Sequence, residues 1–318
     1  MAYLPFYINP EELAAYQEAQ EQEILTGAHL TKWHKYDVEE PFRYLFLCLS
    51  IAPMIPILMF TYFIGYWDVG VGEFLFNFGF ILICYFVSYL TLGLDYRYDY
   101  IFSDKGFVVK KRRNMPTWVN TAVQAVGWIG AIVCVLMVAV AGPMLLVGAG
   151  GFILVSFRLL KRQPDEPTEV KVGEREDWLF AYYNKKRKVI QFFFKYDRCE
   201  YQDTAKKTIF RSQGRFDCYI FFKTKADLEA MVRQLSQVYK LDCTEVADHK
   251  KLFEAKPEPR LFDIPSYYTE FLTDQVFELR GSNTPRPDCK YLYNGQWQTE
   301  SEIEQAKKEG KAPLGEIT

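Results

Sequence analysis

The side chains that most often perform catalysis or bind metals are few in this sequence and follow no known catalytic pattern. The three histidines are His29, His34 and His249, and a spacing of five does not place the first two on one helix face. The sequence contains no HExxH, no paired CxxC and no GxSxG, so neither a zinc site nor an elbow nucleophile is indicated. We therefore predict a protein that is not an enzyme and that holds no metal or cofactor.

Two further groups of residues allow more than one interpretation. Asp197, Asp203 and Asp217 could meet in space, although strand ends on a charged domain are the simpler explanation. The basic run 185–188 precedes the aromatic run 192–194, a combination that can bind RNA or lipid, but a hairpin turn with a solvated face explains it more simply. Because the net charge is only −2, nucleic acid is not expected as a partner.

The N-terminal half, which must position any such site, contains three long runs without charged residues: 44–67, 74–94 and 114–157. A helix that crosses a bilayer core of about 30 Å needs roughly 20 apolar residues, so each of the first two runs suits one span. The third run would extend about 66 Å as a single helix, so we divide it at Gly142-Pro143. We predict four transmembrane helices, at 44–67, 74–94, 118–141 and 144–160. A buried globular hairpin is the alternative.

Basic residues set the expected orientation of these helices, because they favour the cytoplasmic side of a membrane. Basic clusters precede the first predicted span, lie between the second and third, and follow the fourth, which places all of them on one side. We therefore expect a multi-pass protein of a bacterial-type inner membrane with both termini in the cytoplasm. The cluster between spans two and three contains Lys110, Lys111, Arg112 and Arg113. Its two interpretations are a site for anionic lipid head groups and a plain positive-inside anchor.

Small residues in the third and fourth predicted spans would let helices approach closely, as they do at interfaces within membranes. These residues are Gly127, Gly130, Gly148 and Gly151. The segment 148–151 is not a phosphate loop, because no Lys-Ser/Thr pair follows it. We predict that these glycines form part of an interface with other subunits; packing of spans three and four on each other explains them equally well.

Outside the charge-free runs, the spacing predicts a β-rich segment preceded by a helix. Asn9 and Glu12 form a capping-box pattern for a helix to about residue 25. A turn at 103–106 separates strands 96–102 and 107–111, and the polar stretch 163–175 reads as a linker. The further strands are expected at 178–183, 189–196, 199–203, 207–211 and 216–222, with turns at 184–188 and Gln213-Gly214.

The C-terminal third changes to helical spacing. Thr224 caps a helix with the apolar stripe Leu228, Met231, Val232, Leu235 and Tyr239. A further helix is predicted over 264–279, with Ser266 as its cap. Asn294-Gly295 is the strongest short hairpin signal in the chain, and Thr299 with Glu302 predicts a final short helix.

The stretch Tyr100-Ile-Phe-Ser-Asp-Lys-Gly-Phe-Val-Val follows a predicted pair of spans, and segment 177–240 ends in the amphipathic helix. In both features the chain resembles bacterial membrane-anchored pleckstrin-homology-like domain proteins. The resemblance implies a small barrel that begins with the 96–111 hairpin and ends with strands and a closing helix. It also implies a binding or scaffolding role at the membrane, without catalytic residues.

The predicted fold class is therefore an α+β membrane protein, with four transmembrane helices in two hairpins and a β-rich cytoplasmic domain closed by an amphipathic helix. The expected domains are 1–43, 44–162, 163–247 and 248–318. The predicted function is that of a non-enzymatic inner-membrane scaffold or accessory subunit, and the alternative is an oligomeric channel or transporter component. The expected partners are membrane lipids and other protein subunits. Whether hairpin 96–111 joins the 163–247 domain is left open.

Overall fold

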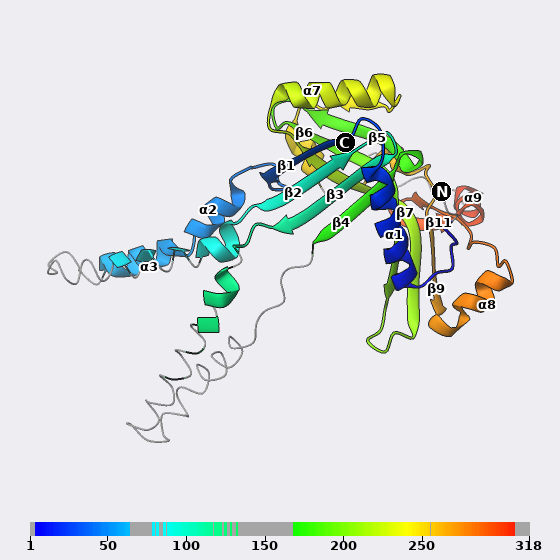
Figure 1. Cartoon of the computed structure of the whole chain (residues 1–318), viewed down its shortest axis with the longest axis horizontal. Helices are drawn as coiled ribbons and strands as arrows, with labels where there is room; N and C mark the ends of the chain where they lie inside the picture. Colours follow the sequence, from blue (N-terminus) through cyan, green and yellow to red (C-terminus); the bar gives the residue numbers. More distant parts are fainter. Residues whose placement is uncertain are drawn as a thin grey trace. The chain divides into compact units, whose positions relative to one another are not determined.

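The structure, a computed structural model, is shown in Figure 1. It describes residues 4–63, 88–116, 168–254 and 256–308, with shorter stretches between 78 and 132. The chain divides into two compact units. The first consists of Met1–Pro41, Tyr98–Lys110 and Val170–Thr318, and the second of Phe42–Arg97 and Lys111–Glu169. The four domains expected from the sequence stay a prediction.

Four strands in the order β1-β2-β3-β4 form one sheet. Their bounds are β1 Thr31–Asp37, β2 Tyr96–Phe102, β3 Gly106–Arg113 and β4 Glu169–Glu174. The predicted β2–β3 hairpin is confirmed, and the Ser103 amide donates to the Gly106 carbonyl across its turn at 2.9 Å. The linker predicted at 163–175 is wrong in its second half, which forms β4. A Cβ at Gly173 in β4 would lie 2.5 Å from the Phe107 ring, so the close packing of this ring requires glycine.

Five strands in the order β8-β5-β6-β7-β9 form a second sheet. Their bounds are β5 Trp178–Asn184, β6 Val189–Tyr201, β7 Thr208–Phe221, β8 Cys243–Glu245 and β9 Tyr267–Leu272. The predicted β5–β6 hairpin is confirmed. The predicted turn at Gln213-Gly214 is wrong, because β7 continues through both residues and Gln213 pairs with Tyr267 of β9. A Cβ at Gly214 would lie only 3.1 Å from the Ser266 Oγ, so this glycine permits a close approach instead of a turn.

Two helices begin where their capping residues predict. In α1 (Pro10–Leu25) the Glu12 amide donates to the Asn9 side chain at 2.7 Å, and the Glu12 carboxylate accepts from the Asn9 amide at 3.1 Å. Thr224 and Asp227 form the same reciprocal pair at the start of α7 (Lys225–Arg233), which continues as a π-helical turn over Gln234–Val238. Three residues of its predicted apolar stripe are buried: Leu228, Met231 and Leu235.

The helix predicted over 264–279 is wrong for most of its length. Its first half forms β9, because backbone pairing with β7 outweighs the helical spacing of its side chains, and helix α8 covers only Val276–Gly281. The hairpin predicted around Asn294-Gly295 is confirmed as β10 (Lys290–Tyr293) and β11 (Gln296–Thr299), and α9 (Glu300–Lys308) follows it. Short 3-10 turns lie at Arg175–Asp177, His249–Phe253, Pro259–Leu261 and Thr273–Gln275.

Aromatic rings fill the space between the two sheets. Phe107 of β3 lies 5.0 Å from both Phe192 and Phe194 of β6. The Tyr100 hydroxyl donates to a backbone carbonyl of β7 at 2.9 Å and accepts a hydrogen bond from the Phe221 amide at 3.1 Å. Burial raises the pKa of Tyr100 well above its usual range, so this hydroxyl stays neutral. The β2–β3 hairpin therefore packs with the β-rich segment that follows, which answers the question left open by the sequence.

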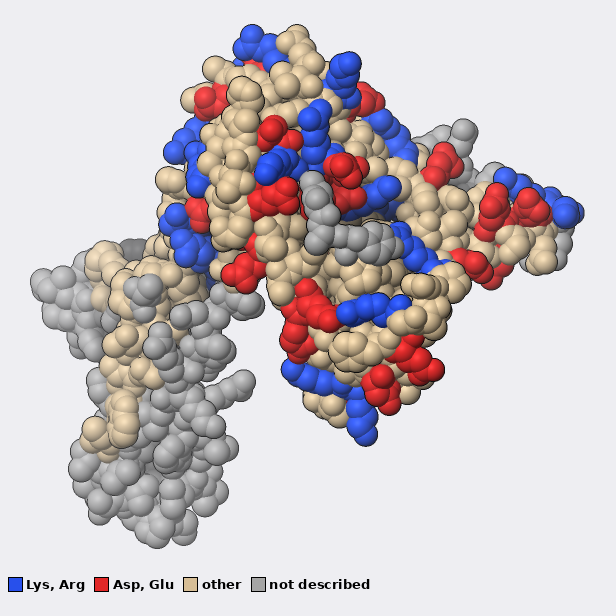
Figure 2. All heavy atoms as spheres, turned by 45° about the vertical axis from the view of Figure 1, so that its right-hand side comes forward, with Lys and Arg blue, Asp and Glu red and all other residues tan. Residues whose placement is uncertain are grey.

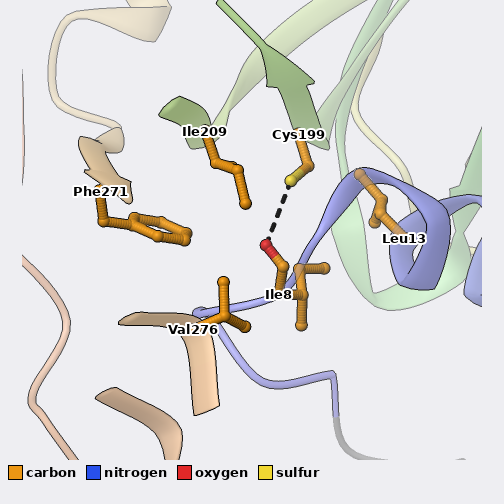
Figure 3. Packing of buried hydrophobic residues seen from close by; sticks show 6 residues of the cluster. All are labelled: Ile8, Leu13, Cys199, Ile209, Phe271 and Val276. Carbon is orange, nitrogen blue, oxygen red and sulfur yellow. Dashed lines mark hydrogen bonds between the residues drawn. The ribbon is translucent and has the colours of Figure 1, made fainter. Parts of the chain in front are cut away.

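A second apolar cluster joins segments that are far apart in the sequence (Figure 3). It consists of Ile8, Leu13, Cys199, Ile209, Phe271 and Val276. The Cys199 thiol donates to the Ile8 carbonyl at 3.4 Å. At its other end, α1 packs Ile24 against Val108 and Val172 of the first sheet. Helix α1 thus contacts both sheets, as Figure 1 shows.

Among the described residues of the second unit, α2 (Leu45–Ile51) and α3 (Met54–Phe63) are short helices separated at Pro53, and a π-helical turn lies at Tyr89–Gly93. Across the described parts of the chain, no helix combines the length and the apolar character that a membrane crossing needs. The prediction of four transmembrane helices is corrected by this finding, together with the multi-pass inner-membrane location and the cytoplasmic termini. The span predicted at 144–160 lies outside the described residues, as do most residues of the span at 118–141 and some of the span at 74–94.

Candidate protein-binding surface

The positions predicted from the sequence as interface contacts stay a prediction, and those predicted as lipid contacts lie on β3. Gly127, Gly130, Gly148 and Gly151 lie outside the described residues. The basic run Lys110, Lys111, Arg112 and Arg113 forms the end of β3. In it, Lys110 pairs with Glu21 at 2.6 Å, Lys111 lies 4.9 Å from the Tyr96 ring centroid, and Arg113 donates to the Leu90 carbonyl at 3.3 Å. These side chains have partners within the protein, and the predicted contact with lipid finds no support.

The three aspartates that could have met in space contact different groups. Asp197 pairs with Arg211, Asp203 accepts hydrogen bonds from the amides of Lys207 and Thr208, and Asp217 accepts one from Gln191. Within the described residues, no three His, Cys, Asp or Glu side chains are grouped so that they could hold a metal ion. Burial raises the pKa of the Cys199 and Cys243 thiols to about 11, which makes both weak nucleophiles.

A group of cations and aromatic rings lies where β7, β9 and the β10–β11 hairpin meet. We call it the basic aromatic cluster, and it consists of Arg215, Tyr267, Tyr268, Arg286, Lys290 and Trp297. Each cation lies over one ring: Arg215 is 4.5 Å from the centroid of Trp297, Arg286 is 5.8 Å from that of Tyr267, and Lys290 is 4.1 Å from that of Tyr268. A cation–π contact of this kind contributes about 0.5–2 kcal/mol.

Backbone pairing with the residue before β9 positions the β10–β11 hairpin beside β7 and β9. Ser266, the residue before β9, exchanges two hydrogen bonds of 2.8 Å with Lys290. The hairpin turn holds Asn294 and Gly295 at φ of 52° and 74°, which a two-residue turn of the I′ kind requires. The register sets Trp297 opposite Leu292 and Lys290 opposite Thr299, so Trp297 and Lys290 share one face of the hairpin.

Arg215 is the half-buried cation of the cluster. Its Nη1 donates to the Ile264 carbonyl, whereas its Nη2 is shielded from solvent and meets no hydrogen-bond partner among the residues that the structure describes. Burial lowers the pKa of Arg215 to about 10. The surroundings therefore disfavour the charge of this guanidinium without offering a carboxylate that would compensate it.

The cluster differs in charge pairing from other parts of the first unit. Arg211, also in β7, forms an ion pair of 2.5 Å with Asp197. On the face seen in Figure 2, acidic and basic side chains are interspersed. By contrast, Arg215, Arg286 and Lys290 form no ion pair within the described part of the chain. These three cations thus differ from Arg211, which has an acidic partner at ion-pair distance.

The sequence analysis missed this cluster. Arg215 lies far from the hairpin along the chain, and the two meet only because β9, which was predicted to be helical, pairs with β7. A compositional signal was nevertheless present, since segment 286–297 contains one Trp, two Tyr and one Arg. These residue types are enriched in the central part of protein–protein interfaces.

Comparison with known proteins gives two matches that agree with each other. The family described as TsiV2 immunity protein matches residues 17–256. The immunity protein TsiV2 of Vibrio cholerae serotype O1 is 39% identical over 70 residues, which make up 22% of this chain and 29% of that protein. The aligned part therefore covers less than a third of the relative's length. No solved structure matches the chain.

These matches correct the interpretation drawn from the sequence. The resemblance to membrane-anchored pleckstrin-homology-like proteins is wrong, and so are the predicted roles as an inner-membrane scaffold, accessory subunit, channel or transporter component. The expectation of a protein partner agrees with an immunity protein, whereas lipid partners find no support. Because the family match covers three quarters of its length, the chain belongs to the TsiV2 immunity protein family.

Proposed function

We propose that this chain confers immunity by binding a toxin protein and holding it inactive, with the basic aromatic cluster as part of the binding surface. The observation that carries the proposal is the contact of Trp297, which is 40% exposed, with Arg215, a cation that forms no ion pair within the described residues. Trp, Tyr and Arg side chains supply most of the binding energy at protein interfaces. Membership of the immunity protein family supplies the class of partner.

The proposed action is stoichiometric and non-enzymatic. An immunity protein that covers the active surface of a toxin inhibits the toxin without turnover. Such an inhibitor needs tight binding and no catalytic residue. The weak nucleophilicity of Cys199 and Cys243 supports this proposal, since Cys199 is buried, Cys243 is half-buried, and both thiols have a raised pKa.

Within the surface, we assign the central position to Trp297 and its contact with Arg215. Anchors of this kind dominate binding when neighbouring residues exclude water from around them. The half-buried Tyr267 and the exposed Arg286 that lies over it are on the face of the sheet that Arg215 shares with Gln213, and we assign them to the more polar rim.

The test begins with capture of the toxin on the full-length chain, its identification by mass spectrometry, and production of that toxin in cells with or without the chain. We expect the native chain to restore growth. We expect Trp297→Ala to weaken toxin binding by about 30-fold or more, which is a hot-spot loss. Phe277→Ala is the matched control, because Phe277 is 71% exposed but lies outside the cluster. The proposed function would be refuted if the chain captures no toxin, or if the native chain does not restore growth of cells that produce the captured toxin.

A further inference from the structure

We infer that a second copy of this chain packs on a bare face of the five-stranded sheet, where β6, β7 and β9 lie side by side, and that the two copies form a dimer with two-fold symmetry. We call this surface the bare face, and it consists of Arg198, Glu200, Phe210, Ser212, Tyr268 and Glu270. Strand alternation places it on the side of the sheet opposite to Arg211 and Arg215. It is therefore a different surface from the one that we assign to the toxin.

The two sides of this part of the sheet are covered very differently. On one side, Ile209 and Phe271 are buried in the apolar cluster that also contains Ile8. On the other side, every residue of the bare face is exposed or half-buried. At its centre, the ring centroids of Phe210 and Tyr268 lie 6.5 Å apart. Aromatic rings that are open to solvent and surrounded by charged side chains are typical of a surface that binds another protein.

The register of the strands arranges the bare face in two rows. The first row consists of Arg198, Ser212 and Tyr268, and the second of Glu200, Phe210 and Glu270. Along each strand the two rows differ in kind: a cation precedes an anion on β6, a small side chain follows a large ring on β7, and a phenol precedes a carboxylate on β9. Lys290 adds a cation to the first row, since its Nζ lies 4.1 Å from the Tyr268 ring centroid and donates to the hydroxyl at 2.8 Å.

This pattern is complementary to itself. A two-fold axis that runs across the strands, between the two rows, places each row of one copy opposite the other row of the second copy. Arg198 then faces Glu200 of the second copy, and Lys290 faces its Glu270. On β7 the large ring of each copy faces the small side chain of the other. Two sheets that pack in this way lie about 10 Å apart with their strands within about 30° of each other, which is an ordinary arrangement of two sheets.

The charges of the bare face favour a second copy over a partner of one charge sign. Arg198 forms an ion pair of 2.6 Å with Glu200, and Glu270 accepts a hydrogen bond of 2.7 Å from Gln202. The surface thus carries both signs in neighbouring rows, so a strongly acidic or strongly basic partner would be repelled by one of the two rows. A second copy presents the same two rows in reverse order.

Sedimentation velocity of the full-length chain, at about 1 to 300 µM, measures the dimer. Because the bare face is smaller than the roughly 20–30 residues per side of a standard interface, we expect a Kd of about 1–50 µM. Phe210→Glu should raise the Kd by about 30-fold or more, since it places a charge at the centre of the interface. Phe277→Glu is the matched control, because Phe277 is 71% exposed but lies on α8, outside the bare face. We expect it to leave the Kd unchanged.

A charge exchange tests the two-fold symmetry. Arg198→Glu and Glu200→Arg each place like charges opposite each other in a dimer of identical copies, so each variant alone should be monomeric. In an equal mixture of the two variants, both pairs of opposite charges are restored, and the Kd should return to within about threefold of the native value. Both positions are exposed, so each variant should keep the circular dichroism spectrum of the native chain.

A native chain that stays monomeric at the highest concentration would overturn the inference. A dimer that Phe210→Glu leaves intact would do so as well, and so would a mixture of the two charge variants that stays monomeric. If the native chain is monomeric and Phe210→Glu instead abolishes toxin binding, the bare face belongs to the toxin and the inference is wrong. Growth of cells that produce the toxin is a separate measurement, so protection by a monomeric native chain would leave the proposed function intact.

Discussion

The same substitution at two positions of one strand should have opposite consequences for stability. Arg211 and Arg215 are both in β7, but Arg211 is 1% exposed and paired with Asp197, whereas Arg215 has no ion pair within the described residues. Methionine preserves most of the side-chain length and removes the charge. We expect Arg211→Met to destabilise the fold strongly and Arg215→Met to leave its stability nearly unchanged, or slightly increased.

The loss of stability expected for Arg211→Met follows from the polar groups that lose their partner. Asp197, whose side chain is 20% exposed, loses its counter-charge, and the Phe6 carbonyl loses its hydrogen-bond donor. Removal of one partner from a buried ion pair costs about 3–5 kcal/mol, a large part of the usual 5–15 kcal/mol for unfolding. At Arg215, loss of a cation–π contact of about 0.5–2 kcal/mol is offset by removal of an uncompensated buried charge. We expect a net change within about 1 kcal/mol there.

Urea unfolding of the full-length chain, followed by circular dichroism, measures both changes if the two variants keep the m-value of the native protein. Asp197→Asn, alone and combined with Arg211→Met, gives a double-mutant cycle in which we expect a coupling of at least about 1 kcal/mol. Equal losses of stability for the two methionine variants would refute the reasoning. A loss below about 1 kcal/mol at Arg211 would do so as well, since it would mean that the pair contributes little.

Three further predictions concern single positions. Gly173→Ala should lower stability by about 1–3 kcal/mol in thermal melts, because the new Cβ would lie 2.5 Å from the Phe107 ring; an unchanged melting temperature would contradict the packing. Burial and the nearby carboxylates of Asp197, Glu174 and Glu176 raise the pKa of Asp177 to about 6. The folded state therefore binds more protons than the unfolded state between pH 4 and 6, and stability from this group is lost as the pH rises through 6. Asp177→Asn should therefore stabilise the fold at pH 7.5 by about 1–3 kcal/mol but not at pH 4, and an equal effect at both would argue against a raised pKa. Cys199 and Cys243, whose pKa is raised to about 11, should resist iodoacetamide at pH 7.5 in the folded protein and react in urea; peptide mass spectrometry would reveal early labelling if this is wrong.

Local signals in the sequence predicted local structure well. The pairs Asn9 with Glu12 and Thr224 with Asp227 cap their helices as expected, because a capping box is satisfied by residues three apart. The Asn294-Gly295 hairpin also forms as predicted, since its positive φ values are a property of these two residues.

Predictions that depended on distant neighbours were wrong. The spacing of 264–279 favours a helix, but the free edge of β7 offers backbone partners that only the folded sheet provides. Gly214 was interpreted as a turn residue, yet it lies within β7, where the absence of a side chain permits the close approach of Ser266. The basic aromatic cluster depends on both of these long-range contacts, so no short stretch of the sequence contains all of its residues.

The apolar cluster shown in Figure 3 has a consequence for the order of events during synthesis. Ile8 packs with Val276, and 268 residues, up to and including Val276, must be added after Ile8 before the two can meet. At about 5–20 residues per second, the ribosome needs roughly 13–54 s for that interval. During this time the N-terminal segment has no access to Phe271 or Val276, and Ile8 can be covered only in part, by Leu13 of α1 and, once β6 and β7 exist, by Cys199 and Ile209. The emerging chain thus carries an uncovered apolar segment for most of its synthesis, which makes it a natural substrate for chaperones that act at the ribosome.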